Sequence, residues 1–119
     1  MIGRRLKVKY NTDVHGNPTL WVRTDLLPWP EQPGDYVGPV LGWTGDKPAV
    51  FFLKPNARDA DAPPRARSVQ HVVSPPHTFR ECADGSLEIR NSIGDLAGPG
   101  SESDGWHGFL DEGHVWRKA

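Results

Sequence analysis

The chain has little cysteine, little excess charge and no long apolar run. Cys82 is the only cysteine in 119 residues, so an internal disulfide is excluded and nothing indicates an oxidising compartment. The net charge of −1 lacks the basic excess typical of a duplex nucleic-acid binder. No stretch approaches the roughly 20 apolar residues that span a bilayer. We therefore expect no membrane partner, no duplex binding, and a place in a cytoplasm or in a particle assembled in one.

The usual sequence marks of a catalytic or metal site are also missing. The chain has no Cys-x-x-Cys or His-x-His pair, no Gly-x-Ser-x-Gly elbow and no phosphate-cradling glycine loop. A zinc site would need three or four of the possible ligands to converge, but their spacing in the sequence does not match that of zinc ligands. These residues are His71, His77, Cys82, His107 and His114. We predict no catalytic residue, no metal and no cofactor, with a small hydrolase using His107 or Cys82 as a lesser alternative.

What the chain does have is 13 glycines and 12 prolines, spread along its whole length. They interrupt every apolar run, so long helices have nowhere to form, while aromatic and β-branched residues recur between them. This composition predicts an all-β fold with eight or nine short antiparallel strands, in a sandwich or a partly open barrel. We expect a single domain over residues 1–119, with exposed loops near 55–67 and 95–105.

Period-two alternation predicts a hairpin of residues 6–10 with 20–23, with Leu6, Val8, Leu20 and Val22 facing inward. Four other side chains then share its outer face: Lys7, Lys9, Trp21 and Arg23. Cations beside an indole are suited to an anionic or stacking ligand, so these four are candidate binding residues. The alternative is that the lysines only protect a sheet edge.

The middle of the chain predicts a second hairpin, 36–44 with 49–54, and strands over 68–73, 77–80 and 86–90 with a turn at 83–85. Residues 50–53 are continuously apolar, which indicates a central strand covered on both faces. Glu81 and Glu88 have arginines beside them, and we expect exposed cross-strand ion pairs there.

Residues 105–119 predict a closing hairpin with a three-residue turn at 111–113. That register places Leu110 opposite His114, puts Trp106 and Trp116 on one face with Trp116 over Gly108, and leaves His107 on the other face and His114 exposed. Large aromatics mostly serve packing, yet a hairpin with apolar residues on both faces also suits a contact surface. Trp106, His107 and Trp116 are therefore further candidates for partner or ligand binding.

The stretch from Phe79 to Ile93, followed by Gly105-Trp106-His107-Gly108-Phe109-Leu110 and Gly113, resembles the C-terminal part of a family of small uncharacterised bacteriophage proteins. The shared pattern is a Ser-Ile strand end, then a Trp-His or Cys-His strand running into a glycine turn, with matches at Ser92, Ile93, Trp106, His107 and Gly113. Members of that family often carry N-terminal cysteines suggestive of metal, which this chain lacks. The resemblance implies a phage origin and a compact β domain, and it implies no activity.

Together these features favour a non-catalytic, phage-type binding or assembly module that self-associates and contacts another protein, as a virion or host-interaction accessory. The alternative is a small protein that sequesters a nucleotide-like ligand in a pocket lined by Trp21, Trp106, His107 and arginines.

Overall fold

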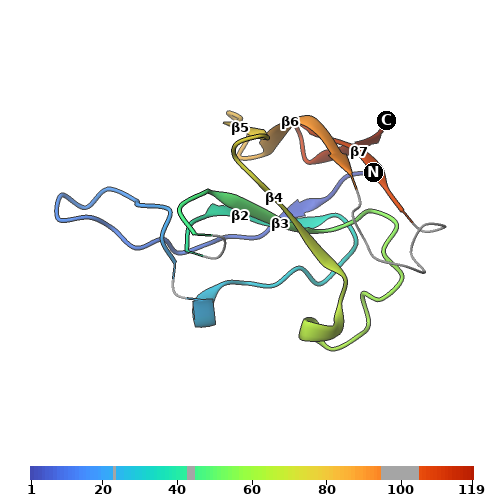
Figure 1. Cartoon of the computed structure of the whole chain (residues 1–119), viewed down its shortest axis with the longest axis horizontal. Helices are drawn as coiled ribbons and strands as arrows, with labels where there is room; N and C mark the ends of the chain where they lie inside the picture. Colours follow the sequence, from blue (N-terminus) through green and yellow to red (C-terminus); the bar gives the residue numbers. More distant parts are fainter. Residues whose placement is uncertain (23, 43–44, 95–104) are drawn as a thin grey trace.

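The computed structural model describes residues 1–22, 24–42, 45–94 and 105–119, which form two four-stranded sheets (Figure 1). In spatial order the first sheet comprises β1 (Arg4–Arg5), β2 (Asp35–Val40), β3 (Ala49–Leu53) and β4 (Val69–Val73). The second comprises β5 (Thr78–Glu81), β6 (Leu87–Gly94), β7 (His107–Asp111) and β8 (Val115–Lys118). β1 pairs with β2 in parallel, and all other neighbours are antiparallel. The all-β sandwich prediction is confirmed, and the barrel alternative is not.

Helical structure among the described residues is confined to two 3₁₀ turns, η1 (Thr24–Leu26) and η2 (Pro64–Ala66). None of it is long and apolar enough to cross a membrane. The loop predicted at 55–67 contains η2 and no strand, whereas most of the loop predicted at 95–105 lies outside the described residues.

The main core lies between the two sheets. The first sheet contributes Tyr36, Val50, Phe52 and Val72, and the second contributes Leu87, Ile89, Ile93, Leu110 and the indoles of Trp106 and Trp116. A second cluster, which includes Val37, Ala49 and Phe51, covers the opposite face of the first sheet. Successive residues of β3 therefore enter different clusters, which confirms the prediction of a central strand buried on both faces.

The N-terminal residues join the two sheets. Ile2 forms an antiparallel bridge with Val115, the Gly3 amide donates to the His114 carbonyl at 2.7 Å, and the Trp116 amide donates to the Met1 carbonyl at 2.8 Å. A Cβ on Gly3 would overlap the Gly34 carbonyl and the Trp116 indole. The first residues are thus wedged between β2 and β8, and the N- and C-termini lie near one another (Figure 1).

The predicted N-terminal hairpin is wrong in its pairing. Residues 6–10 belong to no strand, and among the described residues backbone pairing with the returning chain is limited to an isolated Thr12–Pro18 bridge and the loop hydrogen bonds around it. Leu20 adopts a positive φ of 67°, which interrupts the extended conformation a ladder needs. The predicted facing is right for Leu6, Val8 and Val22, which contact the second cluster, but Leu20 is not in it.

The closing hairpin has the predicted faces in a different register. Leu110 lies opposite Trp116 rather than His114, because Gly113 and His114 both take positive φ and the turn occupies residues 112–114. A shift of two positions in pairing preserves which side chains share a face. Gly108 is covered by the ring of Trp106, not by Trp116 as predicted, while the Trp116 indole donates to the Gly34 carbonyl at 2.8 Å.

Candidate functional site

A groove of about 510 Å³ lies beside the N-terminal segment. One wall is this segment and the other is formed by two turns of the second sheet, so residues far apart in sequence line it: Arg5, Leu6, Lys7, Val8, Tyr10, Gly38, Asp84, Gly85 and His114. Four consecutive residues, 5–8, line the groove. Because alternate side chains of an extended chain point in opposite directions, such a run means that the backbone edge itself faces the groove.

Arg5 holds one part of this groove together. Its guanidinium binds both Glu81 carboxylate oxygens at 2.6 and 2.7 Å, and it also donates to the carbonyls of Gly38 and Gly85. This hydrogen-bonded pair raises the pKa of Arg5 and lowers the pKa of Glu81. Arg5 therefore links the N-terminal segment to β2, β5 and the 83–85 turn, and its charge is already balanced.

His114 is oriented by a buried tyrosine. The Leu87 amide donates to the Tyr36 hydroxyl at 3.2 Å, and the same hydroxyl lies 2.6 Å from His114 Nδ1. The direction of the Tyr36–His114 hydrogen bond depends on which ring nitrogen carries the proton, because a phenolic oxygen both donates and accepts. Burial raises the pKa of Tyr36. His114, predicted to be exposed, is instead half-buried and lines the groove.

A second feature is a projecting arm, residues 10–21, which extends away from both sheets (Figure 1). Its residues 11–18 are all exposed, yet hydrogen bonds hold its form. The Asp13 carboxylate accepts from the His15 and Asn17 amides at 2.8 and 3.0 Å, which lowers the pKa of Asp13. Asn11 is bonded through its amide to the Trp21 carbonyl at 2.7 Å. The turn at the tip is therefore preorganised, and it presents Val14 with 95% of its surface exposed.

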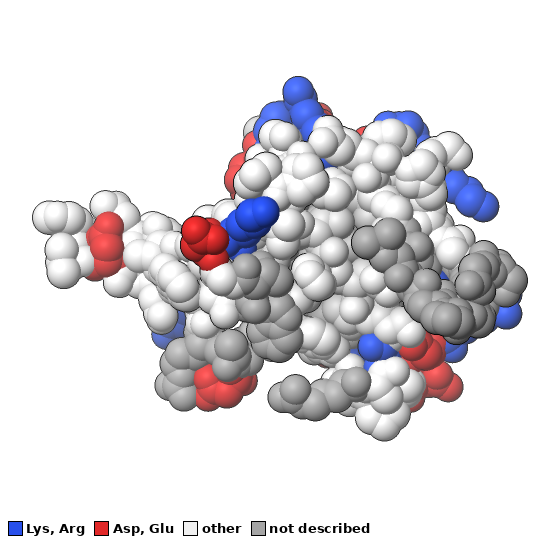
Figure 2. All heavy atoms as spheres, in the orientation of Figure 1, with Lys and Arg blue, Asp and Glu red and all other residues white. Residues whose placement is uncertain are grey.

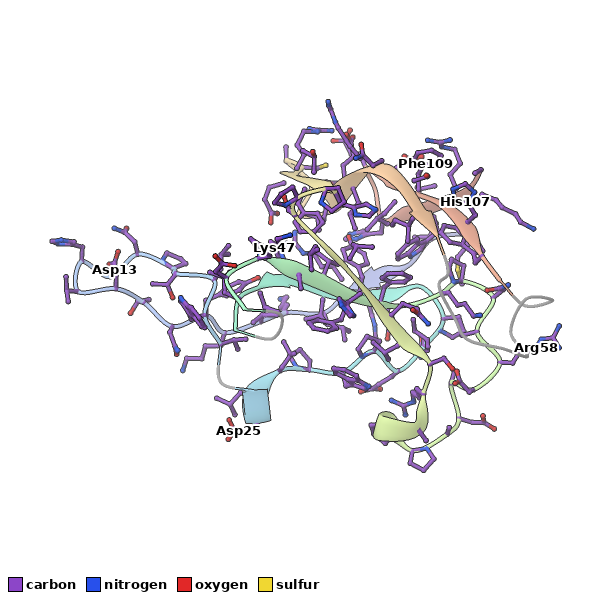
Figure 3. The ribbon with its side chains drawn as sticks, in the orientation of Figure 1. Asp13, Asp25, Lys47, Arg58, His107 and Phe109 are labelled. Carbon is purple, nitrogen blue, oxygen red and sulfur yellow. The ribbon has the colours of Figure 1, made fainter. Side chains whose placement is uncertain are left out.

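The predicted site residues of the closing hairpin separate into core and surface. Trp106 and Trp116 are buried and pack edge to face with ring centroids 5.5 Å apart. His107 is exposed, and Figure 3 shows it beside Phe109 at the end of the molecule away from Asp13. The Arg117 guanidinium lies 4.3 Å from the Phe109 ring centroid on that outer face. The two indoles thus serve packing, and His107 lies apart from them.

The predicted N-terminal site residues also lie in different parts of the structure. Lys7 lines the groove, Lys9 is exposed, and Trp21 rests on Gly42 at the base of the arm with 47% of its surface exposed. Arg23 lies outside the described residues. This groove is lined by none of Trp21, Trp106 and His107, so the pocket predicted from those three stays a prediction.

Several groove residues were missed by the sequence analysis. Tyr10, Asp84 and Arg5 have no distinctive local motif, and only their convergence in the fold places them together. Of the predicted cross-strand ion pairs, Arg80–Glu88 forms at 2.7 Å, whereas Glu81 pairs with Arg5 instead. Arg90 binds Glu88 within the same strand at 2.9 Å, and the two arginines lower the pKa of Glu88 to about 2.

One group of possible metal ligands occurs within the described ranges. Ligand atoms of Cys82, Asp84 and Glu112 lie within 4.8 Å of one another, and no histidine belongs to the group. Asp84 Oδ1 already accepts hydrogen bonds from the amide and hydroxyl of Ser86, and the buried Cys82 thiol lies 3.7 Å from the Arg80 carbonyl. Both groups have partners within the turn, which accounts for this proximity without an ion.

No family model, no curated protein and no solved structure matches this chain. The resemblance to bacteriophage proteins therefore stays a prediction.

Proposed function

We propose that this chain is a non-catalytic binding and assembly module that contacts protein through the projecting arm, and that one of its partners is a second copy of itself. The observation that carries the proposal is the ordered tip of the arm, which holds Val14 in solvent at 95% exposure. The phage origin predicted from the resemblance, with a role as a virion or host-interaction accessory, belongs to the same proposal.

The arm has the properties of a contact element rather than of a loose loop. A hairpin that lacks its own core is marginally stable in water, and here eight consecutive exposed residues are kept in one form by the Asp13 turn and the Asn11–Trp21 bond. Because the arm is already ordered before contact, it loses less conformational entropy on binding. In Figure 2 the arm stands clear of the body, and most of its visible surface carries no charge.

Three of the exposed large apolar side chains lie on the arm or in the segment that follows it. Val14 lies at the tip, Trp21 at the base, and Leu26 follows in η1 with 55% of its surface exposed. Exposed apolar surface on a soluble domain is typical of interaction sites. Tyr10 anchors the base through a 2.8 Å hydrogen bond from its hydroxyl to the Pro39 carbonyl, so force applied to the arm is transmitted to β2.

Sedimentation velocity over a wide concentration range tests the proposal. We expect the native chain to associate as concentration rises and Val14→Asp to stay monomeric at the same concentrations, because a carboxylate at the tip opposes burial of that surface. Val14→Ile keeps the apolar character and is the matched control. A native chain that remains monomeric throughout, or a Val14→Asp variant that associates equally well, would contradict self-association through the arm.

A nucleotide-like ligand is the second candidate, and the groove with Lys7 is the observation in its favour. A thermal-shift screen against nucleotides checks it. Stabilisation by a nucleotide that is lost in Lys7→Gln would support this function over pure assembly.

A further inference from the structure

The N-terminal segment presents two different backbone edges. On one side, the Arg4 and Leu6 amides donate to the Gly34 and Tyr36 carbonyls, toward β2. On the other, the Gly3 amide donates to the His114 carbonyl of the second sheet. Because backbone groups of successive residues in an extended chain point to opposite sides, the amides and carbonyls of Arg5 and Lys7 point the same way as those of Gly3.

The neighbour on that second edge ends too early to pair with them. β8 begins at Val115, and His114 belongs to the turn with a φ of 62°, so the second sheet turns away just past Gly3. Among the described residues, Arg5 and Lys7 form no backbone hydrogen bond on this edge, and the groove occupies the place of a pairing strand. An unpaired edge of this kind is a template for strand addition.

We propose that the groove binds an extended segment of a partner protein, which pairs with the backbone of Arg5 and Lys7 and carries an acidic side chain beside Lys7. This site shares only Tyr10 with the arm, and the proposal does not rest on the arm's function. At about 3.3 Å per residue, roughly four residues of a strand would cover the two backbone positions.

Charge identifies the side chain that fits. Leu6 and Val8 pack against the second core cluster, so Lys7 and Lys9 point to the opposite, exposed face. Neither lysine forms an ion pair within the described ranges, whereas Arg5 is bound to Glu81. A cross-strand neighbour of Lys7 lies about 5 Å away between Cβ atoms, where an opposite charge is favourable and a like charge is not.

The far wall adds polar groups suited to a peptide. The His114 ring, held through Nδ1 by the Tyr36 hydroxyl, has a second ring nitrogen that can bond to a peptide backbone group, and the Asp84 carboxylate is an acceptor for an amide. Asp84 also disfavours a second acidic side chain on that wall. One acidic position flanked by apolar or neutral residues is therefore the composition that matches the groove.

Backbone NMR titration with two synthetic peptides tests the proposal: acetyl-Thr-Val-Glu-Val-Thr-amide and the same peptide with Lys in place of Glu. We expect the glutamate peptide to shift the amide signals of Arg5, Lys7, Gly85 and His114, and to bind about tenfold more tightly than the lysine peptide, equivalent to one close charge pair. Equal affinity for the two peptides, no binding, or shifts confined to other residues would overturn it.

Two substitutions at one position separate charge from backbone pairing. Lys7→Gln keeps the amide and loses the charge, whereas Lys7→Pro loses both, and its amide has no backbone partner in the unbound structure. We expect binding of the glutamate peptide to weaken in Lys7→Gln and to weaken about tenfold further in Lys7→Pro, with both variants folded by circular dichroism. Lys118→Gln, a lysine elsewhere on the surface, is the charge control.

Lys7→Glu covers the case in which Lys7→Pro fails to fold, because it should reverse the preference to the lysine peptide. Unchanged preference in Lys7→Glu would contradict the proposal. Binding should also survive Val14→Asp, so failure of the arm proposal is distinguishable from failure of this one. If the unliganded chain self-associates with shifts at Arg5 and Lys7 that a Lys7 substitution abolishes, the occupant is a second copy, and the proposal of a separate partner is wrong.

Discussion

Residues 1–22 and 105–119 meet where residues 1–3 bond to residues 114–116, and the two regions are built in opposite ways. The closing hairpin directs its large rings inward, and Trp116 contacts Trp106, Phe52 and Tyr36 there. The N-terminal region, by contrast, has an open backbone edge at Arg5 and Lys7 and an apolar side chain in solvent at Val14. The aromatic-rich region supplies buried packing, and the plainer region contains both of the surfaces proposed to bind partners. In these proposals the conspicuous tryptophans of the closing hairpin belong to the core, and the binding surfaces lie elsewhere.

Trp116→Ala should give the largest effect on stability. Trp116 has only 3% of its surface exposed, and its indole N–H donates to the Gly34 carbonyl. Loss of a buried aromatic ring costs about 3–5 kcal/mol in the free energy of unfolding. Chemical denaturation checks this, with the half-exposed Trp21→Ala as the matched control. Similar losses for the two variants would remove the contrast between the regions.

Gly3→Ala tests whether the two regions are joined as tightly as the structure indicates. Its Cβ would overlap the Gly34 carbonyl and Trp116, and overpacking of this kind costs about 1–3 kcal/mol. Gly94→Ala is the control, because a Cβ there meets nothing within 4 Å. A thermal melt of both variants gives the comparison. If Gly3→Ala melts like the native chain, the wedge between β2 and β8 is not needed for stability.

The alternation of side chains along the closing hairpin predicted which residues share a face, but not which residues pair across the strands. The prediction that Trp106, Leu110 and Trp116 share one face was right because alternation in a strand survives a pairing shift of two residues. The turn was displaced by one residue because His114, which is not a glycine, takes a positive φ, and no local pattern indicates that.

The groove could not be predicted from the sequence, for a different reason. Alternation at residues 6–10 fits a paired strand and an unpaired extended segment equally well, since either one packs Leu6 and Val8 on the core. The facing of Lys7 was therefore predictable. The gap beside it depends on where the 83–85 and 112–114 turns end in space, which is a long-range property of the fold.

Glu81→Gln should give the smallest effect and the one that depends on pH. Arg5 lowers the pKa of Glu81 below its ordinary value of 4.5, so the pair stabilises the native state above that pH, and its contribution is lost as the pH falls through the lowered value. The pair is largely exposed on the glutamate side, so we expect no more than about 1 kcal/mol at neutral pH.

Denaturation of the native chain and of Glu81→Gln at neutral pH and at acid pH checks this. The difference between the two should shrink as the pH falls, while Glu112→Gln, a nearby carboxylate outside the Arg5 pair, should leave the native pH dependence in place. A constant difference across the pH range would show that Arg5 does not link the two regions through this charge.

The bonds between Met1, Gly3 and residues 114–116 also set an order of events during synthesis. Residues 1–3 form one of their two edges with residues made more than a hundred positions later, and such distant contacts delay folding. While the chain is on the ribosome, the first strand can pair with β2, but its second edge has no partner until the closing hairpin emerges. The edge proposed to receive a partner is therefore most open in the unfinished chain, where premature strand addition is the hazard to be avoided.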